Sequence, residues 1–341
     1  MVAGNLAEVT RALQLESRHV GSVVLARADG TLVGVVGDRN RIVFPRSSIK
    51  IIQALPLIES GAADRYEMTS AELACACASH SGTPFHVATI AALLARIGIP
   101  QKALACGTHL PLGEIAKRHM LASKEAACAL HNNCSGKHAG MLAVAHHEGE
   151  PLTEYEIADH PVQMRIRQTL AEVTGADLSH AVPGVDGCSV PNWPLPLMNL
   201  AVGFARIVTG KDLPPARAAA FERLLAACWA EPVAMAGEGR FDTEMLSRFA
   251  GEVFVKGGAE GVYCGGIRSK GIGFALKADD GAGRGAEAAA AAIIAHLVDG
   301  AEDLAGPKVL LNARGIAVGD IRAGDSLLSV LNAIQANSEA G

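Results

Sequence analysis

The sequence predicts an α+β fold, in which an antiparallel sheet is built from both ends of the chain around a largely helical middle region. β-branched and apolar runs gather near the N-terminus and in the C-terminal third, and capped helical segments fill the stretch between them. Of the 341 residues, 50% are hydrophobic and 19% are charged, below the roughly 25% of an average soluble chain. We expect a single domain over residues 1–341, with its sheet at about 20–45 and 250–330 and its helices at about 47–249.

The first elements are three short strands and a helix. Val23–Arg27 and Thr31–Val36 flank an Ala-Asp-Gly turn and predict a hairpin, and Arg41–Phe44 predicts a third strand. Ser47–Ser60 has apolar residues at helical spacing and stops before a glycine. Pro56 lies inside this helix and is expected to kink or break it.

Helices dominate the middle of the chain. Pro84–Ile97 has Thr83 as its N-cap, proline at its first position and Gly98 after its end, which together indicate a helix. The further expected helices are Lys137–His147, Pro161–Thr174, Leu197–Thr209, Pro215–Ala230 and Asp242–Phe249.

Strands return in the C-terminal third. Glu252–Lys256 and Gly271–Lys277 have the composition of strands, and the alanine-rich stretch Ala286–Leu297 predicts a helix after them. Lys308–Asn312 and Gly315–Val318 predict a second hairpin. The strand order is not predictable from these patterns.

Charge and composition exclude several classes of function. The net charge of −5, without blocks of like charge, and the aromatic content of 4% give no footprint for nucleic acid. The apolar run Ala288–Ala295 is far shorter than the roughly 20 residues of a membrane span, and the N-terminus lacks the pattern of a signal peptide. We expect a cytoplasmic protein without nucleic-acid or membrane partners, whose eight cysteines, none spaced as CxxC, are mostly thiols.

Ser47 and Lys50 form the first motif with chemical potential, an SxxK at the start of a helix. Residues three apart lie on one helical face, so a lysine of lowered pKa could deprotonate the serine hydroxyl. The helix start would also stabilise an oxyanion. The alternative is that Ser47 only caps the helix and Lys50 is a solvated lysine.

Two further motifs follow in order. Ser79-His80-Ser81 lies in a small polar turn, and Lys256-Gly257-Gly258 ends an expected strand. The order SxxK, Ser-x-Ser, Lys-Gly-Gly is similar to the three boxes of serine β-lactamases and penicillin-binding proteins, and it predicts their architecture. Each motif alone is equally compatible with an ordinary turn.

Two polar loops complete the set. His131–His138 is compact and lies at the start of a helix, and Pro183–Pro191 has Asp186 as its only charge. One acid flanked by glycines suits recognition of a substrate ammonium group, although a capping aspartate is the more common case.

In this order, the segments PRSSIK, CASHSGTP, HNNCSGKHAGM, GVDGCSVP and VFVKGGAEGVY resemble the asparaginase II family, the Rhizobium-etli-type or class 3 L-asparaginases. The resemblance runs over almost the whole chain. It implies a fold similar to serine β-lactamases and glutaminases, a homodimer, and hydrolysis of the side-chain amide of L-asparagine to L-aspartate and ammonia.

The resemblance also implies roles for individual residues. Ser47 is the nucleophile and Lys50 its base, and Ser79 forms a second Ser–Lys pair with Lys256. An acyl-enzyme forms on Ser47 and water then hydrolyses it.

The same resemblance implies the groups that bind substrate and metal. Asp186 holds the α-amino group of the substrate, and Arg46 and His138 are candidates for its carboxylate. The implied zinc ligands are Cys134, Lys137 and Cys188. Two thiolates suit zinc, and a lysine ligand must be neutral, so zinc affinity should fall at low pH. From the residues alone, small buried thiols are the favoured interpretation of both cysteines.

Asp242, in GRFDTEM, stands where the family often has cysteine, and this could alter metal affinity, substrate range or pH profile. Three alternatives stay open. The same chemistry could act on glutamine or a β-lactam; Cys134 and His138 could form a cysteine amidase; or the chain could be a non-catalytic protein that binds zinc or an amino acid.

Overall fold

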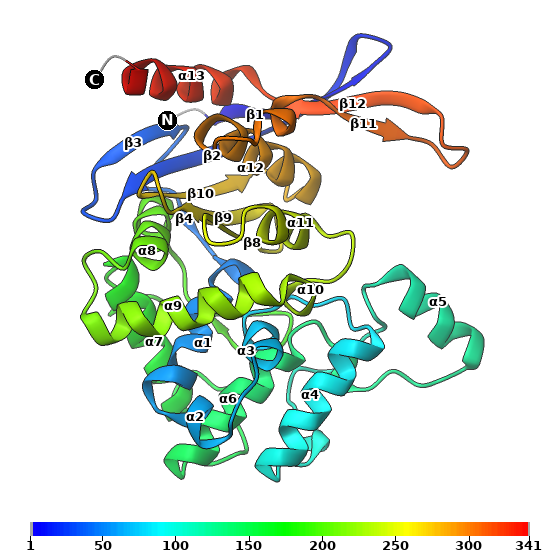
Figure 1. Cartoon of the computed structure of the whole chain (residues 1–341), viewed down its shortest axis with the longest axis vertical. Coiled ribbons are helices and arrows are strands. Elements are labelled where there is room, and N and C mark those ends of the chain that lie inside the picture. Colours follow the sequence, from blue (N-terminus) through cyan, green and yellow to red (C-terminus); the bar gives the residue numbers. More distant parts are fainter. Residues whose placement is uncertain (1–2, 340–341) are drawn as a thin grey trace. The chain divides into compact units, whose positions relative to one another are not determined.

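The computed structural model describes residues 3–339 and confirms the predicted α+β class, with an antiparallel sheet from both chain ends and a helical middle (Figure 1). The chain divides into two compact units. The sheet unit comprises Met1–Ser48, Leu195–Asp212 and Val255–Gly341, and the helical unit comprises Ile49–Pro194 and Leu213–Phe254. Each unit is described by itself, and the single domain over residues 1–341 stays a prediction.

The large sheet has eight strands, and every strand pair with a resolved register is antiparallel. The main path runs, in spatial order, through β11 (Lys308–Leu311), β12 (Ala317–Ala323), β1 (Gly4–Arg11), β2 (Gln14–Arg27), β10 (Ile272–Ala278), β9 (Val262–Ile267) and β8 (Val253–Gly257). Off this path, β3 (Leu32–Val36) pairs with the second half of β2. β4 (Ile42–Val43) forms a separate pair with β7 (Leu195–Pro196).

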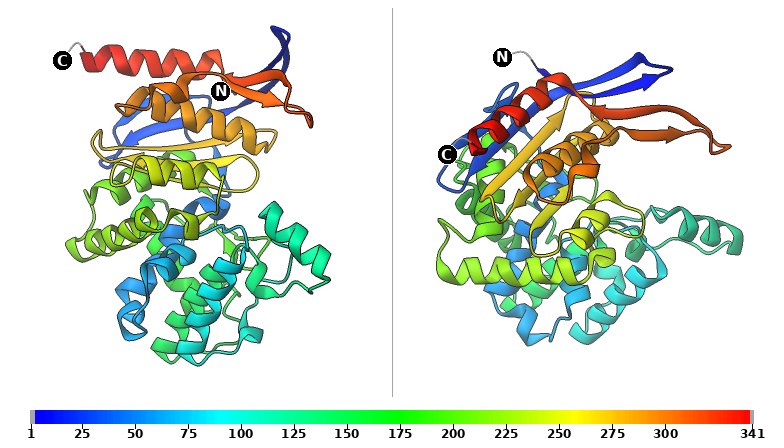
Figure 2. Two further views of the ribbon diagram at one scale, coloured as in Figure 1. Left: turned by 45° about the vertical axis from the view of Figure 1, so that its right-hand side comes forward. Right: turned by 45° about the horizontal axis from the view of Figure 1, so that its top comes forward.

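Helices cover both faces of the central strands. The consecutive residues Val23–Ala26 of β2 are all fully buried, and because successive side chains point to opposite faces, both faces must be covered. α8 (Leu197–Thr209) packs on β2, β9 and β10, and α12 (Gly283–Leu297) packs on β1, β9, β10 and β12. α13 (Asp325–Glu339) lies against β1 and β3 (Figure 2).

Gly273 on β10 allows the close approach of α8. A Cβ atom at this position would lie 2.1 Å from the carbonyl oxygen of Ala201, well inside contact distance. Leu197–Thr209 was expected among the helices of the middle region and has the predicted bounds, but it belongs to the sheet unit. Its apolar face is buried against the strands, which explains the placement.

The sheet also contains strands that the sequence did not predict. β2 begins at Gln14 and pairs with β1 through a turn in which Ala12 and Leu13 have φ values of 47° and 68°. Non-glycine residues rarely adopt this left-handed conformation. Because Ala12 and Leu13 stand where a two-residue hairpin turn usually has Asn-Gly, the sequence shows no signal for this turn. The first residues of β2 are exposed, and the chain there shows no buried apolar run.

In the helical unit, α1 (Lys50–Glu59) packs against five other helices, α2, α3, α6, α7 and α9. Pro56 was expected to kink or break this helix; it does not break it, because α1 continues through this residue to Glu59. Burial of every residue from Lys50 to Leu57 stabilises the helix despite the missing N–H donor. The other helices of the unit are α2 (Ala62–Arg65), α3 (Ser70–Ala76), α4 (Pro84–Ile97), α5 (Glu114–Ser123), α6 (Ser135–Glu148), α7 (Pro161–Thr174), α9 (Pro215–Ala230), α10 (Pro232–Met235) and α11 (Phe241–Arg248).

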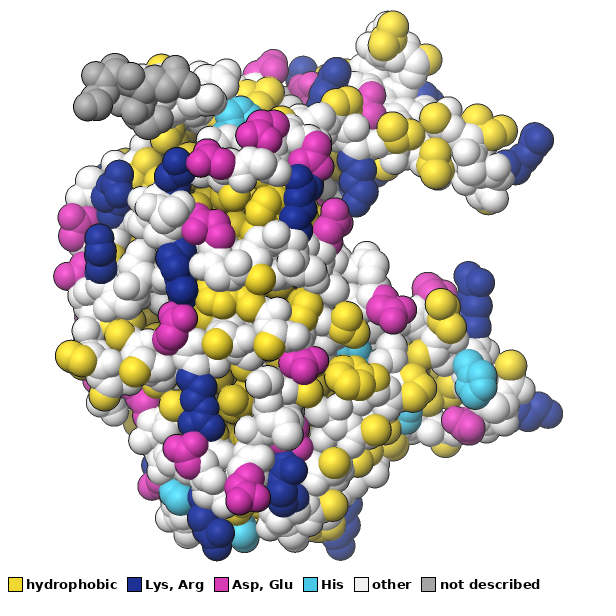
Figure 3. All heavy atoms as spheres, in the orientation of Figure 1, with side chains coloured by type: hydrophobic (Ala, Val, Ile, Leu, Met, Phe, Trp, Pro, Cys, Tyr) yellow, Lys and Arg dark blue, Asp and Glu magenta, His cyan; other side chains and the backbone are white. Residues whose placement is uncertain are grey.

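The surface agrees with the charge pattern of the sequence. On the face shown in Figure 3, Lys and Arg side chains are interspersed with Asp and Glu side chains. None of the helices described within residues 3–339 combines the length and the apolar character needed to cross a membrane.

Candidate active site

Lys50 is the first residue of α1, and its side chain is fully buried. Its Nζ donates to Ser79 Oγ at 3.0 Å, to the carbonyl oxygen of Asn133 at 3.4 Å, and to the carbonyl oxygen of Ala78. Three acceptors match the three N–H donors of an ammonium group. The helical unit therefore brings two of the predicted catalytic residues, Lys50 and Ser79, into direct contact.

The loop that carries Ser79 lies between α3 and α4, where the sequence predicted a small polar turn but no helix at α3. α3 starts with a capping box, in which Thr69 Oγ1 accepts from the Glu72 amide and the Glu72 carboxylate accepts from the Thr69 amide. After α3, the amide of His80 donates to the carbonyl oxygen of Asn133 at 3.2 Å. The same carbonyl accepts from Lys50, so one backbone group fixes both sides of the Lys50–Ser79 contact.

Lys137, Cys188 and Cys134 converge elsewhere in the helical unit. Lys137 lies on α6 and its Nζ donates to Cys188 Sγ at 3.0 Å. Cys188 lies in the turn between β5 (Gly184–Val185) and β6 (Pro191–Asn192). All three side chains are buried.

Charge stabilises this cluster in a particular protonation state. A hydrogen bond from Cys134, with the ammonium of Lys137, outweighs burial and lowers the pKa of Cys188 to about 5. The same hydrogen bond, together with burial, raises the pKa of Cys134 to about 12. Burial alone would lower the pKa of Lys137, but the sulfur atoms of Cys188 and Cys134 outweigh it and raise that pKa. The cluster is therefore a buried thiolate–ammonium pair with a thiol beside it.

The donor set of this cluster fits zinc in its chemistry. Two cysteine sulfurs and one nitrogen are ligand types that zinc accepts, and the three side chains already lie together. Within residues 3–339, no three His, Cys, Asp or Glu side chains are grouped as a metal site. Lys137 would therefore have to be the third ligand, after losing the proton that it now shares with Cys188.

Asp186 belongs to the same turn as Cys188. Its carboxylate lies 3.6 Å from Cys188 Sγ, and its amide donates to the carbonyl oxygen of Val190 at 2.9 Å. The predicted ammonium-binding carboxylate thus lies directly beside a predicted metal ligand.

His138 is fully buried on α6, one residue after Lys137. The hydroxyl oxygen of Tyr155 accepts from the Ala105 amide at 2.8 Å. The hydroxyl proton of Tyr155 is then directed to Nδ1 of His138, which lies 2.7 Å from the same oxygen. Nε2 of His138 then carries the ring proton and has no hydrogen-bond partner among the described residues. Burial, with the charge of Lys137, lowers the pKa of His138 to about 3, so the ring is neutral.

In the sheet unit, the SxxK turn lies beside the Lys-Gly-Gly segment. A Cβ atom at Gly258 would lie 2.9 Å from the carbonyl oxygen of Pro45 and 3.3 Å from the amide nitrogen of Ser48, so only glycine allows this approach. Lys256, on β8, is buried and its Nζ donates to the carbonyl oxygen of Gly257 at 2.8 Å. The sheet thus places the lysine box against the turn that contains Ser47.

That turn is itself held in an unusual conformation. Arg46 has a φ of 53°, in the left-handed region that non-glycine residues rarely adopt. Ser47 follows in the short 3₁₀ helix Arg46–Ile49. Ser48 Oγ donates to the Pro45 carbonyl at 2.7 Å and accepts from Cys264 Sγ at 3.4 Å, which fixes the turn from behind. Backbone strain beside a candidate nucleophile is typical of functional sites.

Four residues with structural roles at these sites were not singled out from the sequence: His80, Asn133, Tyr155 and Cys264. His80 and Asn133 stand within quoted motifs, but their contacts depend on chain segments that are distant in sequence. Asp242, at the position where the family often has cysteine, is buried in the first turn of α11.

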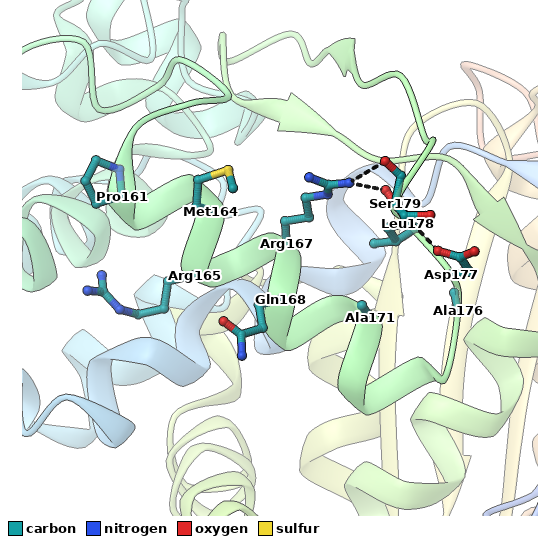
Figure 4. A pocket seen from close by; sticks show the side chains of 10 residues that line it. All are labelled: Pro161, Met164, Arg165, Arg167, Gln168, Ala171, Ala176, Asp177, Leu178 and Ser179. Atoms are coloured by element: carbon teal, nitrogen blue, oxygen red, sulfur yellow. Dashed lines mark hydrogen bonds between the residues drawn. The ribbon is translucent and has the colours of Figure 1, made fainter.

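A surface pocket of about 580 Å³ lies between α7 and residues 176–179, and no predicted site residue lines it (Figure 4). Arg167 in this pocket donates to the carbonyl oxygens of Leu178 and Ser179. Its side chain is therefore already engaged in holding that segment.

Comparisons with known proteins identify the family. The model of a family described as L-asparaginase II matches residues 7–323 of the chain. No curated protein matches the chain significantly.

Three solved structures have a backbone path similar to that of this chain. A candidate β-lactamase of Bacteroides dorei DSM 17855 has 12% identity and a TM-score of 0.42, over 76% of this chain and 84% of that chain. A β-lactamase of Mycobacterium bovis has 11% identity and a TM-score of 0.37, over 81% and 94%. Mglu, in its tris and glutamate form, has 14% identity and a TM-score of 0.37, over 87% and 64%. Nothing about the site depends on these three likenesses.

Proposed function

Because the chain belongs to the L-asparaginase II family and is an amidohydrolase of the asparaginase kind, we propose that it hydrolyses L-asparagine to L-aspartate and ammonia. The observation that carries the mechanism is the buried contact between Lys50 Nζ and Ser79 Oγ. A buried lysine in contact with a serine hydroxyl is a group that can move protons during acyl transfer.

In the proposed mechanism, Lys50 acts as a neutral amine, after its ammonium group has released one proton to solvent, and takes the proton of Ser47 as Ser47 Oγ bonds to the side-chain amide carbon of the substrate. The electron pair of the C=O bond moves to oxygen, and backbone N–H groups at the start of the 3₁₀ helix and α1 stabilise this oxyanion. When the oxyanion collapses, the C–N bond breaks. The leaving nitrogen takes a proton from the group formed by Ser79 and the two lysines, Lys50 and Lys256, and departs as ammonia. This leaves a β-aspartyl ester on Ser47.

Water completes the cycle. The same lysine and serine groups take a proton from water as its oxygen bonds to the ester carbon, and Ser47 Oγ leaves with a proton returned from Lys50. The products are free aspartate and the regenerated hydroxyl. For substrate binding, we propose that Asp186 holds the α-ammonium group and that Arg46 and His138 bind the α-carboxylate. His138 is neutral, so it would contribute a hydrogen bond from Nε2–H and no charge.

We also propose zinc on Cys134, Lys137 and Cys188, because their donor set fits the ion. When bound, zinc supplies a fixed positive charge beside Asp186 and holds the β5–β6 turn to α6. The proposed reaction requires no step at the metal, since Ser47 already provides the nucleophile.

The cysteine-amidase alternative finds little support in the geometry. The pKa of Cys134 is raised to about 12, so its thiolate is scarce at neutral pH. Nδ1 of His138 accepts from Tyr155 and is not available as a base for Cys134. A homodimer in the cytoplasm remains our proposal for assembly and location, and sedimentation of the purified chain tests the assembly.

Ammonia release from asparagine by the wild type and by Ser47→Ala tests the function. We expect activity in the wild type and its loss in Ser47→Ala, with the fold intact by circular dichroism. Ser70→Ala is the control, because it removes an exposed serine hydroxyl at the start of α3 and should retain turnover. Glutamine and nitrocefin, assayed in parallel, distinguish the substrate classes. Undiminished turnover in Ser47→Ala would falsify the nucleophile assignment, and iodoacetamide-sensitive turnover in that variant would favour the cysteine alternative.

A further inference from the structure

The ring of His80 ties the loop that carries Ser79 to the start of α6. His80 is fully buried. Its Nδ1 accepts from the amide of Gly82 at 3.1 Å, and its Nε2 lies 3.0 Å from Ser135 Oγ. Ser135 is the first residue of α6. One side chain thus bridges two backbone segments that are about 55 residues apart in the chain.

The direction of these hydrogen bonds is fixed by the donors around them. A backbone N–H can only donate, so Nδ1 of His80 must be unprotonated and the ring proton must reside on Nε2. Nε2 therefore donates to Ser135 Oγ, and the Ser135 hydroxyl donates in turn to the carbonyl oxygen of Leu130 at 2.9 Å. A second proton on the ring would place two N–H groups against each other at Gly82.

The surroundings favour the neutral ring. His80 stacks on His86 with ring centroids 4.8 Å apart. Burial, followed by the charges of His86, Lys50, His109 and His131, holds the pKa of His80 well below its usual value. The hydrogen bonds therefore persist through the neutral pH range.

The backbone of the loop that carries Ser79 is also held by close contacts. Gly82 has a φ of 66°, and a Cβ atom there would lie 2.6 Å from the carbonyl oxygen of His131. The amide of His80 donates to the same Asn133 carbonyl that accepts from Lys50 Nζ. With both of these contacts in place, the Ser79 side chain has little freedom to leave Lys50.

We propose that His80 is a positioning residue, which acts through the loop to hold the hydroxyl of Ser79 against Lys50 Nζ. This inference rests on the proposed function, because it assumes that the Ser79 hydroxyl takes part in turnover. His80 itself touches neither substrate nor reacting atoms in the proposed mechanism. Its loss should therefore lower kcat and leave KM almost unchanged, because a catalytic group displaced by about 1 Å can slow a reaction on the order of 100-fold.

The test compares His80→Ala with His160→Ala. His160 is a matched control: its Nδ1 also accepts from the amide two residues later, Val162, at 3.2 Å, and its Nε2 lies 2.9 Å from the Pro151 carbonyl. Each substitution removes a buried histidine together with its hydrogen bond from the amide two residues later. Only His80, however, lies in the loop that carries Ser79. We expect kcat for ammonia release to fall about 10- to 100-fold in His80→Ala and to stay within about twofold in His160→Ala.

A double variant shows whether His80 acts through Ser79. If it does, adding His80→Ala to Ser79→Ala should lower kcat no further. His80→Gln, whose amide N–H can still reach Ser135, should recover part of the activity. Should His80→Ala fail to fold, Ser135→Ala carries the test, because it leaves the His80 ring in place and removes the acceptor of Nε2–H, together with the hydrogen bond from Ser135 to the Leu130 carbonyl oxygen.

The outcomes separate the two proposals. If Ser79→Ala is fully active, the proposed role of Ser79 fails, and with it the need to position that hydroxyl. If Ser79→Ala is impaired but His80→Ala behaves like His160→Ala, the proposed function stands and the positioning role is overturned. A further loss in the double variant also overturns it, because His80 would then act on something other than Ser79.

Discussion

The ammonium group of Lys50 donates to the hydroxyl oxygen of Ser79 across 3.0 Å, although 29 positions separate the two residues in the chain. The contact lies within the helical unit and is buried on both sides. It joins a lysine and a serine from two different sequence motifs by one hydrogen bond. The first prediction follows from this contact.

Lys50→Met should lower kcat for ammonia release by at least 100-fold, because it removes the group that exchanges protons with serine. It also leaves the carbonyl oxygen of Ala78 without its lysine donor. Lys102→Met, on an exposed turn, is the control and should be fully active. Steady-state kinetics of both variants provide the measurement. Near-normal kcat in Lys50→Met would exclude Lys50 as the base.

Cys188→Ala should abolish zinc binding and also weaken the fold. It removes the thiolate that neutralises the buried ammonium of Lys137, and breaking a buried ion pair costs about 3–5 kcal/mol of unfolding free energy. Cys228→Ala, at a buried cysteine of α9, is the control and should bind zinc like the wild type. Metal content by mass spectrometry after dialysis against zinc measures the first effect, and urea unfolding measures the second. Equal zinc content in both variants would show that Cys188 is not a ligand.

Acid should destabilise the helical unit below about pH 6.5, the ordinary pKa of histidine. Burial lowers the pKa of His86, and burial likewise lowers that of His80. Between the folded and unfolded pKa values the unfolded chain binds more protons, so stability falls as the pH falls, by at most about 1.4 kcal/mol per pH unit for each histidine.

His86→Gln should reduce this slope, because glutamine does not titrate. The measurement is the unfolding free energy from urea titrations at several pH values between 5 and 7, for wild type and variant. His119→Gln, at an exposed site on α5, is the control variant for the loss of one histidine. Parallel pH curves for wild type and His86→Gln would contradict the assignment.

Gly273→Ala should destabilise the sheet unit strongly. The added Cβ atom would lie 2.1 Å from the Ala201 carbonyl and 2.3 Å from the Ala205 amide nitrogen, both backbone atoms of α8. Overpacking of this kind typically costs about 1–3 kcal/mol or more. Gly283→Ala, at the first residue of α12 with nothing within 4 Å, should be neutral or stabilising. Thermal unfolding gives the melting temperature of each variant, and equal melting temperatures would refute the close packing of α8 on β10.

The sequence predicted best where the ends of an element have chemical markers. Pro161–Thr174, Leu197–Thr209 and Pro215–Ala230 have the expected bounds, because a proline, a glycine or both mark their ends. β1 and α13 were not predicted. β1 follows no turn signal, whereas α13 was missed although Leu327, Val330, Leu331 and Ile334 have helical spacing. Strand order depends on pairings such as Ala7 with Ala323, which no local pattern encodes.

The candidate site likewise has features that could be predicted from the sequence and features that could not. The motifs around Ser47 and Ser79 can be recognised from residue spacing, but the contact between Lys137 and Cys188 spans 51 positions and was implied only by the family resemblance. The tautomer of His80 could not be predicted at all. It depends on one amide and one hydroxyl that only the folded chain brings to the ring.

The place of β1 in the sheet has a consequence for synthesis on the ribosome. β1 lies between β2 and β12, and its partner strand β12 ends at Ala323. The helical unit ends at Phe254, so its residues leave the ribosome before β12 does. One edge of β1 must therefore wait, unpaired, for nearly the whole chain to be translated. An exposed strand edge is a template for aggregation, so chaperones should matter most to this protein late in translation.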